Sequence, residues 1–179
     1  LAKLLPNTEI YLGGPEVSYE AGHYLKQYSN IRGIMQGEGE HTFKMLLDAY
    51  DASGFEAADL SDIPGLLLRT GQALPAISVP MDSLPFLYQS DKNQNELSDE
   101  YDNRIIYYES SRGCPFRCSY CLSAIDKTTR FRSLDLVFKE LDFFLKNKVK
   151  QVKFIDRTFN CNHERTVAIW KYITEHDNS

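Results

Sequence analysis

The sequence predicts an α/β fold made of two units, and three observations support this. In residues 9–50, a short apolar strand followed by glycines and an amphipathic helix occurs twice. In residues 104–175, strand and helix alternate again. The charge also changes at the junction, because residues 1–103 hold six basic and sixteen acidic side chains, whereas residues 104–179 hold fourteen and nine. A change of this size at one point indicates two parts with different tasks.

The composition bounds the function classes. The 179-residue chain is 42% hydrophobic and 25% charged, close to the globular average, which excludes a wholly disordered chain and a coiled coil. Its apolar runs are far shorter than the ~20 residues of a membrane span, so we expect no membrane partner. The net charge of −5 argues against a chain that coats nucleic acid. Four cysteines without a recognisable secretory leader favour a reducing, cytoplasmic compartment, and the leucine at position 1 suggests a fragment of a longer protein.

The first unit is expected to form a βαβα arrangement. Residues 9–12 predict a strand, residues 17–28 a helix, and residues 31–35 a second strand. A second helix should bury the face that carries Phe43, Leu46, Leu47 and Tyr50. Two parallel strands joined by a helix are typical of a doubly wound sheet.

The next segment breaks this alternation. Residues 66–69 and 76–79 flank Thr70-Gly71-Gln72 and predict a small hairpin. Residues 89–103 are almost all polar and predict a connector that is partly mobile. The expected division into first domain, connector and second domain is therefore 1–60, 61–103 and 104–179.

The second unit should begin with a strand over 104–110, followed by a loop rich in cysteine. Ser133 is a plausible N-cap for the next helix, and Asn162 for the last one. Between them, residues 149–155 predict a strand that ends at Asp156. The side chains expected to face inward are Val137, Leu141, Phe144 and Leu145 in the first helix and Val167, Trp170 and Ile173 in the second. This order predicts the opening of a second α/β sheet or barrel.

The strongest chemical signal is three cysteines, Cys114, Cys118 and Cys121, on one short loop. Three thiolates so close in sequence can close around a single inorganic centre. A cubane iron–sulfur cluster normally has four cysteine ligands. Three ligands leave one iron without a protein ligand, and an open iron can bind a substrate.

Other interpretations of these residues stay open. Zinc takes four ligands, so a non-catalytic zinc-binding module could use the three cysteines together with Cys161 or His163. An interaction scaffold with incidental cysteines is a further alternative. Nucleic acid is not expected as a partner, because the basic runs 130–132 and 146–150 are short.

Residues 111–121, Ser-Arg-Gly-Cys-Pro-Phe-Arg-Cys-Ser-Tyr-Cys, resemble the cluster loop of the radical S-adenosylmethionine superfamily. That motif has three cysteines spaced by three and by two residues, with an aromatic residue before the last. The resemblance implies a [4Fe–4S] cluster on Cys114, Cys118 and Cys121, with the amino and carboxylate groups of S-adenosylmethionine on the fourth iron. It also implies reductive cleavage to a 5′-deoxyadenosyl radical and a loop that follows the first strand of a partial or full (β/α) barrel.

The same resemblance implies further roles. Asp156 would contact the amino group or ribose of S-adenosylmethionine, and Tyr120 would lie near its adenine. For both residues a purely structural role is the alternative, as a turn cap or ion-pair partner for Asp156 and as packing for Tyr120. The implied partners are a small-molecule substrate and a reductant such as flavodoxin or ferredoxin.

The first unit suggests a subclass. Gly13-Gly14-Pro15-Glu16 follows one strand and Gly37-Glu38-Gly39-Glu40 the next, ahead of the connector 81–85 and the cysteine loop. This order resembles the C-terminal half of a Rossmann-like cobalamin-binding domain followed by the first βα units of a radical S-adenosylmethionine partial barrel. The class includes anaerobic magnesium-protoporphyrin IX monomethyl ester oxidative cyclases and radical methyltransferases.

The resemblance implies cobalamin contacts at Gly13, Gly14, Gly37, Glu38 and Gly39, because glycines at strand ends let the backbone approach a ligand closely. No motif for a lower axial histidine is visible, so cobalamin follows from neighbourhood alone. Because only the first strands of the barrel are expected, the fragment alone should be inactive. The sequence does not choose between methyl transfer and ring closure, nor does it fix the substrate.

Overall fold

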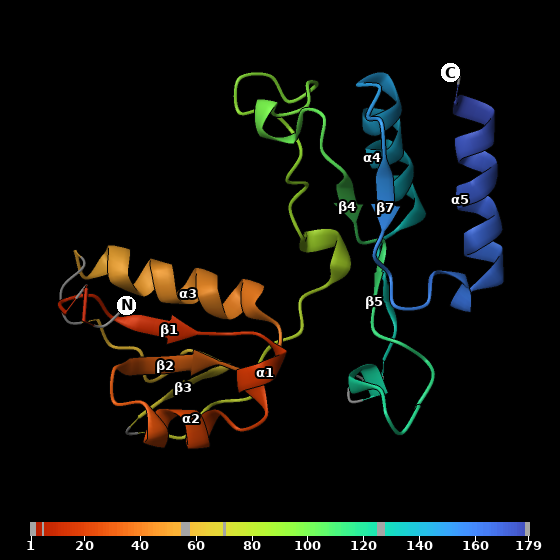
Figure 1. The fold of residues 1–179 in the computed structure, drawn as a ribbon. Coiled ribbons are helices and arrows are strands. Elements are labelled where there is room, and N and C mark those ends of the chain that lie inside the picture. Colours follow the sequence, from red (N-terminus) through yellow and green to blue (C-terminus); the bar gives the residue numbers. More distant parts are fainter. Residues whose placement is uncertain (1–2, 5, 55–57, 70, 125–127, 178–179) are drawn as a thin grey trace. The chain divides into compact units, whose positions relative to one another are not determined.

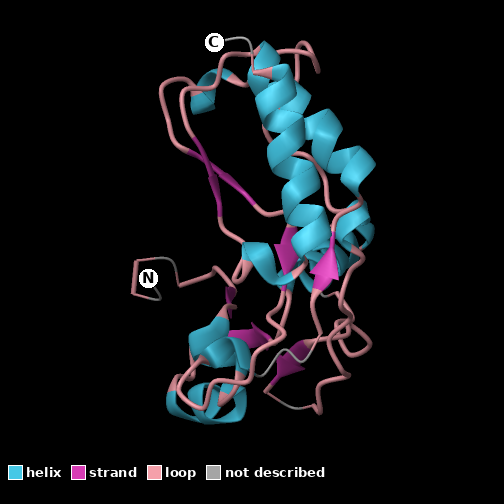
Figure 2. Ribbon diagram, turned by 90° about the vertical axis from the view of Figure 1, so that its right-hand side faces the viewer, coloured by secondary structure: helices cyan, strands magenta, loops and turns pink. Residues whose placement is uncertain are grey.

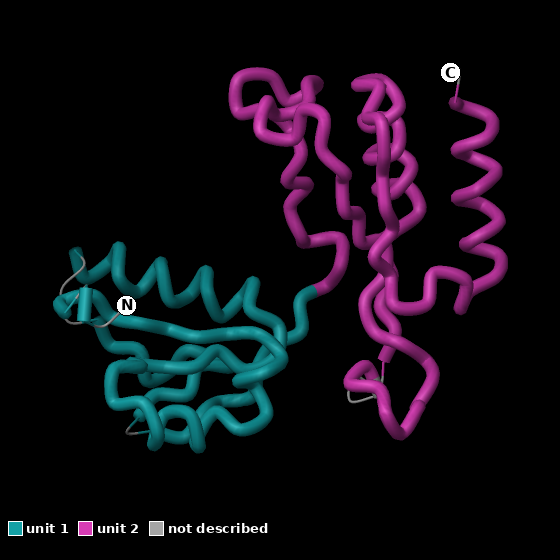
Figure 3. Tube along the Cα trace, in the orientation of Figure 1, with its two compact units in different colours: residues 1–79 teal, residues 80–179 magenta. Residues whose placement is uncertain are grey.

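The computed structural model describes residues 3–4, 6–54, 58–69, 71–124 and 128–177. The chain forms two compact units that divide after Val79, inside the segment expected to be a connector (Figure 3). Both units combine strands and helices, so the α/β fold class is confirmed (Figure 1). The expected domain boundaries at residues 60 and 103 stay predictions.

The first unit is built on a three-stranded sheet in the order β1-β2-β3. Its elements are β1 (Ile10–Leu12), α1 (Pro15–Ser18), α2 (Ala21–Gln27), β2 (Ile31–Met35), α3 (Gly39–Ala52) and β3 (Leu66–Leu68). β1 and β2 are parallel, with Leu12 opposite Ile34, and β3 runs antiparallel to β2, with Leu67 opposite Ile34. The parallel pair expected from the sequence is therefore confirmed.

Each face of this sheet is covered by helices (Figure 1). One apolar cluster joins α1 and α2 to β2 and consists of Val17, Ala21, Leu25, Ile31 and Ile34. The other cluster joins α3 to β3 and consists of Leu46, Leu60, Ile63 and Leu66. Burial of these side chains stabilises the unit by removing apolar area from water.

Three expectations for the first unit are wrong in detail. The helix expected over 17–28 is interrupted between α1 and α2, because Glu20 has non-helical backbone angles. On α3 the buried residues are Thr42 and Leu46, whereas Phe43 and Leu47 are about half exposed. The predicted hairpin does not form, because β3 pairs with β2 and not with residues 76–79; Thr70, in its predicted turn, lies outside the described residues.

The second unit contains a parallel pair of strands joined by a helix. Its main elements are β4 (Ile106–Tyr108), β5 (Ser111–Arg112), β6 (Arg130–Phe131), α4 (Leu134–Lys146), β7 (Val152–Phe154) and α5 (His163–His176). β4 pairs with β7 in register, with Tyr108 opposite Phe154, and α4 connects them. Figure 2 shows α4 and α5 running side by side, where the rings of Phe138 and Tyr172 stack 4.2 Å apart.

The core of this unit lies between the strands, α4 and α5. Its buried residues are Ile106, Tyr108, Val137, Leu141, Phe143, Phe144 and Ile169. Trp170 is 52% exposed, so its expected inward position on α5 is wrong and Ile169 takes that place. The polar segment 89–103 is not a bare connector, because Leu97 and Tyr101 pack against this core. Asn162 caps α5 as predicted, its side-chain oxygen accepting a hydrogen bond from the Arg165 amide.

Among the described residues, no helix has the length and apolar character needed to cross a membrane.

Candidate metal centre

The cysteine loop is closed at its base by two short antiparallel strands. Ser111 of β5 lies opposite Phe131 of β6, and Arg112 lies opposite Arg130. Gly113 is the first residue of the loop and has a φ of 94°, in the left-handed region that favours glycine. The two ends of the loop are thus held side by side by the pairing of β5 with β6.

All three cysteines of the motif lie on this loop without a disulfide. Cys114, next to the base, is half-buried, whereas Cys118 and Cys121 are exposed. The Cys121 amide donates to the Cys118 carbonyl at 3.0 Å, so these two residues share one turn. Residues 125–127, later in the loop, lie outside the described part of the chain.

In the described ranges, no three His, Cys, Asp or Glu side chains form a group that could hold a metal ion. The structure therefore gathers neither the three loop cysteines nor a set completed by Cys161 or His163. The chemistry of the donor set still suits an iron–sulfur cluster, since three thiols fall within eight residues of one closed loop and two of them face solvent. Their role as ligands stays a prediction.

The exit of β7 contacts the entrance of this loop. The carboxylate of Asp156 accepts hydrogen bonds from the Ser110 hydroxyl at 2.9 Å, from the Ser110 amide at 3.3 Å and from the Ser111 hydroxyl. Two residues later, Thr158 Oγ1 lies 3.2 Å from Cys114 Sγ. Asp156 therefore lies at the same end of the sheet as the cysteine loop, and its carboxylate holds the loop entrance. A contact with S-adenosylmethionine stays a prediction.

Arg165 adds a buried cation to the same place. Its guanidinium donates to the Ser110 carbonyl at 3.2 Å and lies 5.3 Å from the centre of the Phe131 ring, so α5 contacts the residue before β5 and the strand β6. Burial lowers the pKa of Arg165 below its ordinary value, although the negative charge of Asp156 opposes the shift. In contrast, Tyr120 is 91% exposed, and its predicted place near an adenine is untested.

The two glycine turns of the first unit lie together at one end of its sheet. Ser18 Oγ donates to the Gly14 carbonyl at 2.8 Å and accepts from the Gly37 amide at 3.2 Å. Gly14 and Gly37 have φ values of 100° and 71°, which favour glycine for backbone reasons alone. This contact between the turns connects the two strand ends that the sequence singled out.

The space beside these glycines differs. A Cβ on Gly14 or Gly39 would meet nothing within 4 Å, so the backbone there is open to a ligand. A Cβ on Gly37 would lie 3.2 Å from the Ala76 Cβ, so another part of the chain covers that glycine. A Cβ on Gly13 would make ordinary contacts with Met35. Gly14 and Gly39 thus have free space beside their backbone, and cobalamin contacts at Gly13, Gly14, Gly37, Glu38 and Gly39 all stay predictions.

Sequence reasoning missed a buried polar network beside the loop base. Arg132 is 6% exposed and Glu140 5% exposed, and they form an ion pair. The Tyr108 hydroxyl donates a hydrogen bond to the Glu140 carboxylate. Burial and the bond to Glu140 raise the pKa of Tyr108 far above its ordinary value. In the sequence, Arg132 was visible only as part of the basic run 130–132, which was considered as a nucleic-acid contact. In the structure Arg132 is buried and therefore cannot contact phosphate.

Comparison with known proteins supports the sequence resemblance. No model of a known protein family matches the chain. The chain is 30% identical over 176 residues to an uncharacterized methyltransferase from Pyrococcus horikoshii, covering 91% of this chain and 36% of that protein. It is 25% identical to the cobalamin-dependent radical SAM methyltransferase TokK from Streptomyces tokunonensis, covering 86% and 24%. It is 27% identical to the anaerobic magnesium-protoporphyrin IX monomethyl ester cyclase from Cereibacter sphaeroides, covering 66% and 20%.

Solved structures show the same fold. The radical S-adenosylmethionine methyltransferase TsrM from Kitasatospora setae matches 97% of this chain and 34% of its own, with a TM-score of 0.68 and 18% identity. The cobalamin-dependent S-adenosylmethionine radical enzyme OxsB matches with a TM-score of 0.65 and 18% identity. The chain spans about a third or less of the length of these relatives.

Proposed function

We propose that this chain, which is related to the cobalamin-dependent radical S-adenosylmethionine enzymes, carries the cluster-binding loop and part of the cobalamin-binding unit of a radical methyltransferase. The observation that carries the proposal is the closed loop of Cys114, Cys118 and Cys121 at the end of the parallel pair β4-β7. Active sites of (β/α) barrels lie at the C-terminal ends of the strands. Sequence similarity over most of the chain to two methyltransferases supports the reaction type.

The residues of the chain have distinct tasks in this proposal. Cys114, Cys118 and Cys121 would ligate three irons of a [4Fe–4S] cluster and leave the fourth for S-adenosylmethionine. When bound, the cluster supplies the electron that cleaves S-adenosylmethionine, and cobalamin supplies a carrier for the methyl group. Asp156 holds the loop entrance through Ser110 and Ser111. Its partly exposed carboxylate would accept a hydrogen bond from the amine of S-adenosylmethionine.

In the first unit, the open backbone at Gly14 and Gly39 would receive the corrinoid at the strand ends, where open α/β sheets bind their ligands. The proposed partners are a small-molecule substrate and a protein reductant such as flavodoxin or ferredoxin. A reducing, cytoplasmic setting would keep the exposed thiols of Cys118 and Cys121 free to bind metal.

A second candidate function is oxidative ring closure, which the similarity to the magnesium-protoporphyrin ester cyclase favours. Both candidates use the same cluster, so they are separated by product analysis and not by metal content. Transfer of labelled methyl from S-adenosylmethionine would support the first candidate, and oxidation without methyl transfer would support the second.

Metal analysis tests the proposal. The chain is prepared without oxygen, supplied with iron and sulfide, and desalted. We expect about four iron and four sulfide ions per chain. Zinc in place of iron would indicate the non-catalytic zinc-binding module. A colourless chain without either metal would indicate that the cysteines are incidental.

A further inference from the structure

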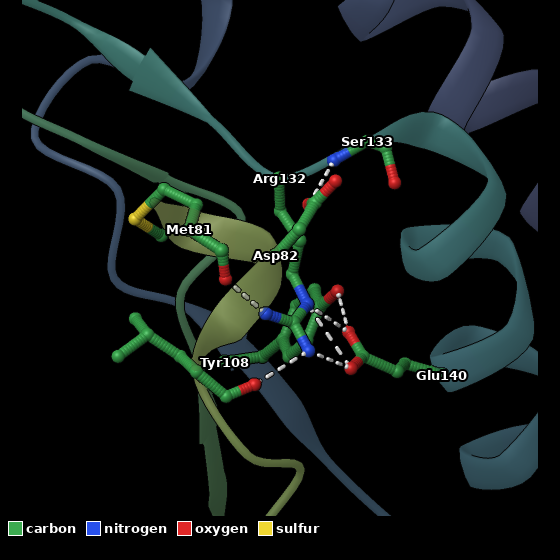
Figure 4. Close-up of polar contacts among 7 residues, drawn as sticks. Met81, Asp82, Tyr108, Arg132, Ser133 and Glu140 are labelled. Carbon is green, nitrogen blue, oxygen red and sulfur yellow. Dashed lines mark hydrogen bonds and ion pairs between the residues drawn. The ribbon is translucent and has the colours of Figure 1, made fainter. Parts of the chain in front are cut away.

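A buried ion pair is formed by Arg132, the residue after β6, and Glu140 of α4 (Figure 4). Arg132 Nε contacts the two carboxylate oxygens of Glu140 at 3.0 and 2.9 Å, and Arg132 Nη2 contacts Oε1 at 2.5 Å. The Tyr108 hydroxyl donates to Glu140 Oε2 at 2.6 Å. The side chains of Arg132 and Glu140 are 7% and 6% exposed, so water contributes little to holding these charges.

The same guanidinium holds the segment 81–84, through which the chain enters the second unit. Arg132 donates to the Met81 carbonyl through Nη1 and to the Leu84 carbonyl through Nη2 at 3.1 Å. Beside it, Asp82 accepts a hydrogen bond of 2.7 Å from the Ser133 amide (Figure 4). Segment 81–84 is therefore held by two neighbouring residues, Arg132 and Ser133.

Arg132 also belongs to the loop base. It follows β6 directly, and its amide donates to the Ser110 carbonyl at 2.9 Å. Ser110 in turn is held by Asp156 and Arg165. One residue thus joins segment 81–84, helix α4 and both sides of the loop that carries the cysteines.

A gain in folding stability does not by itself explain the buried ion pair of Arg132 and Glu140. Removing two charges from water costs free energy, and replacing a buried ion pair with apolar side chains of similar volume is often neutral or stabilising. A guanidinium offers five donors in a rigid plane, which a lysine cannot match. The Arg132 guanidinium bonds to two carbonyls of segment 81–84 and to the Glu140 carboxylate of α4. Its particular contribution is therefore to fix segment 81–84 relative to α4.

We propose that Arg132 is a positioning residue that couples segment 81–84 to the base of the cysteine loop, and so fixes the two ends of the loop that carries the thiols. The link to cluster binding rests on the proposed function, whereas the coupling itself does not. A change that makes segment 81–84 more mobile is expected to make β5 and β6 more mobile too, and a change that makes β5 and β6 more mobile is expected to do the same to segment 81–84.

Hydrogen–deuterium exchange of the whole chain tests the coupling. The triple variant Arg132→Met, Glu140→Leu and Tyr108→Phe replaces the network with apolar side chains. We expect a lower unfolding midpoint, because the Met81 and Leu84 carbonyls lose their donor, and, well below that midpoint, about tenfold faster exchange both in Ser83–Leu84 and in β5–β6. Asp135→Ala, an exposed change in the first turn of α4, serves as the control and should leave both segments unchanged.

If the triple variant does not fold, Asp82→Ala decides the question. Asp82 is exposed and lies outside the ion pair, so its removal loosens segment 81–84 while leaving the buried charges in place. Faster exchange in β5–β6 of this variant supports the coupling. Faster exchange confined to 81–84 and the Ser133 amide, or no change, overturns it.

A spectroscopic readout separates positioning from a merely structural role. After anaerobic reconstitution, the electron paramagnetic resonance signal of the reduced triple variant is expected to differ in shape from that of the wild type, while Asp135→Ala matches the wild type. An unchanged signal beside faster exchange overturns the positioning role. If the wild type itself binds no cluster, the proposed function fails, and the exchange data still decide the coupling.

Discussion

The carboxylate of Asp156 lies 2.9 Å from the hydroxyl of Ser110, which joins two residues that each follow the end of a parallel strand by two positions. Ser110 lies between β4 and the cysteine loop, and Asp156 lies just after β7. This bond fixes the loop entrance to the neighbouring strand. The loop is thus anchored at its base, while Cys118 and Cys121 stay exposed.

Asp156→Ala tests this anchor. The change removes the acceptor for two hydroxyls and one amide, and a hydrogen bond to a charged group is worth about 1.5–3 kcal/mol. We expect the free energy of unfolding of the second unit to fall by about 2 kcal/mol, measured by urea titration with Trp170 fluorescence. Asp91→Ala, on an exposed segment, is the control. Equal, small losses in both variants would mean that the Asp156 bonds contribute little.

Cysteine replacements distinguish the cluster from a zinc site. Cys118→Ser is expected to reduce bound iron after reconstitution to near background, because two thiolates cannot hold the cluster. Cys161→Ser, at a half-buried thiol outside the loop, should leave the iron content unchanged. Loss of metal in both variants would contradict the assignment of three ligands and favour a site that Cys161 completes.

Gly65→Ala tests the packing of the first unit. Gly65 has a φ of 78°, and an added Cβ would lie 2.6 Å from Thr42 Oγ1 and 3.2 Å from the Gln36 carbonyl. The backbone conformation and the overpacking should together cost about 2–4 kcal/mol. Gly71→Ala is the matched control, since its Cβ would meet nothing within 4 Å. Circular dichroism during thermal unfolding measures both, and similar midpoints would refute the packing argument.

The buried tyrosine predicts an alkaline loss of stability. The pKa of Tyr108 is raised in the folded state by burial and by its bond to Glu140, from an ordinary value of 10.0. The folded state therefore binds this proton more tightly, so its contribution is complete below about pH 10 and falls as the pH rises further. Urea unfolding at pH 8 and pH 11 should show a smaller loss for Tyr108→Phe than for the wild type. Equal losses would exclude Tyr108 as a source.

Local patterns predicted much of this architecture. The strands β1, β2, β4 and β7 follow short apolar runs, and Asp156 follows β7 closely, near the predicted end of that strand. Periodicity did not predict which residues far apart in the chain would meet. Arg132 and Met81 are 51 positions apart, and the buried guanidinium looked like part of an exposed basic run. Likewise, β3 pairs with β2 because tertiary packing favours the sheet edge over a local hairpin.

The central claim is that three thiolates leave one iron of the cluster open to S-adenosylmethionine. Electron paramagnetic resonance of the reduced, reconstituted chain, recorded with and without S-adenosylmethionine, tests it most directly. We predict a cluster signal that changes on addition of S-adenosylmethionine and is absent from Cys118→Ser. A cluster signal that stays identical after the addition would contradict the claim.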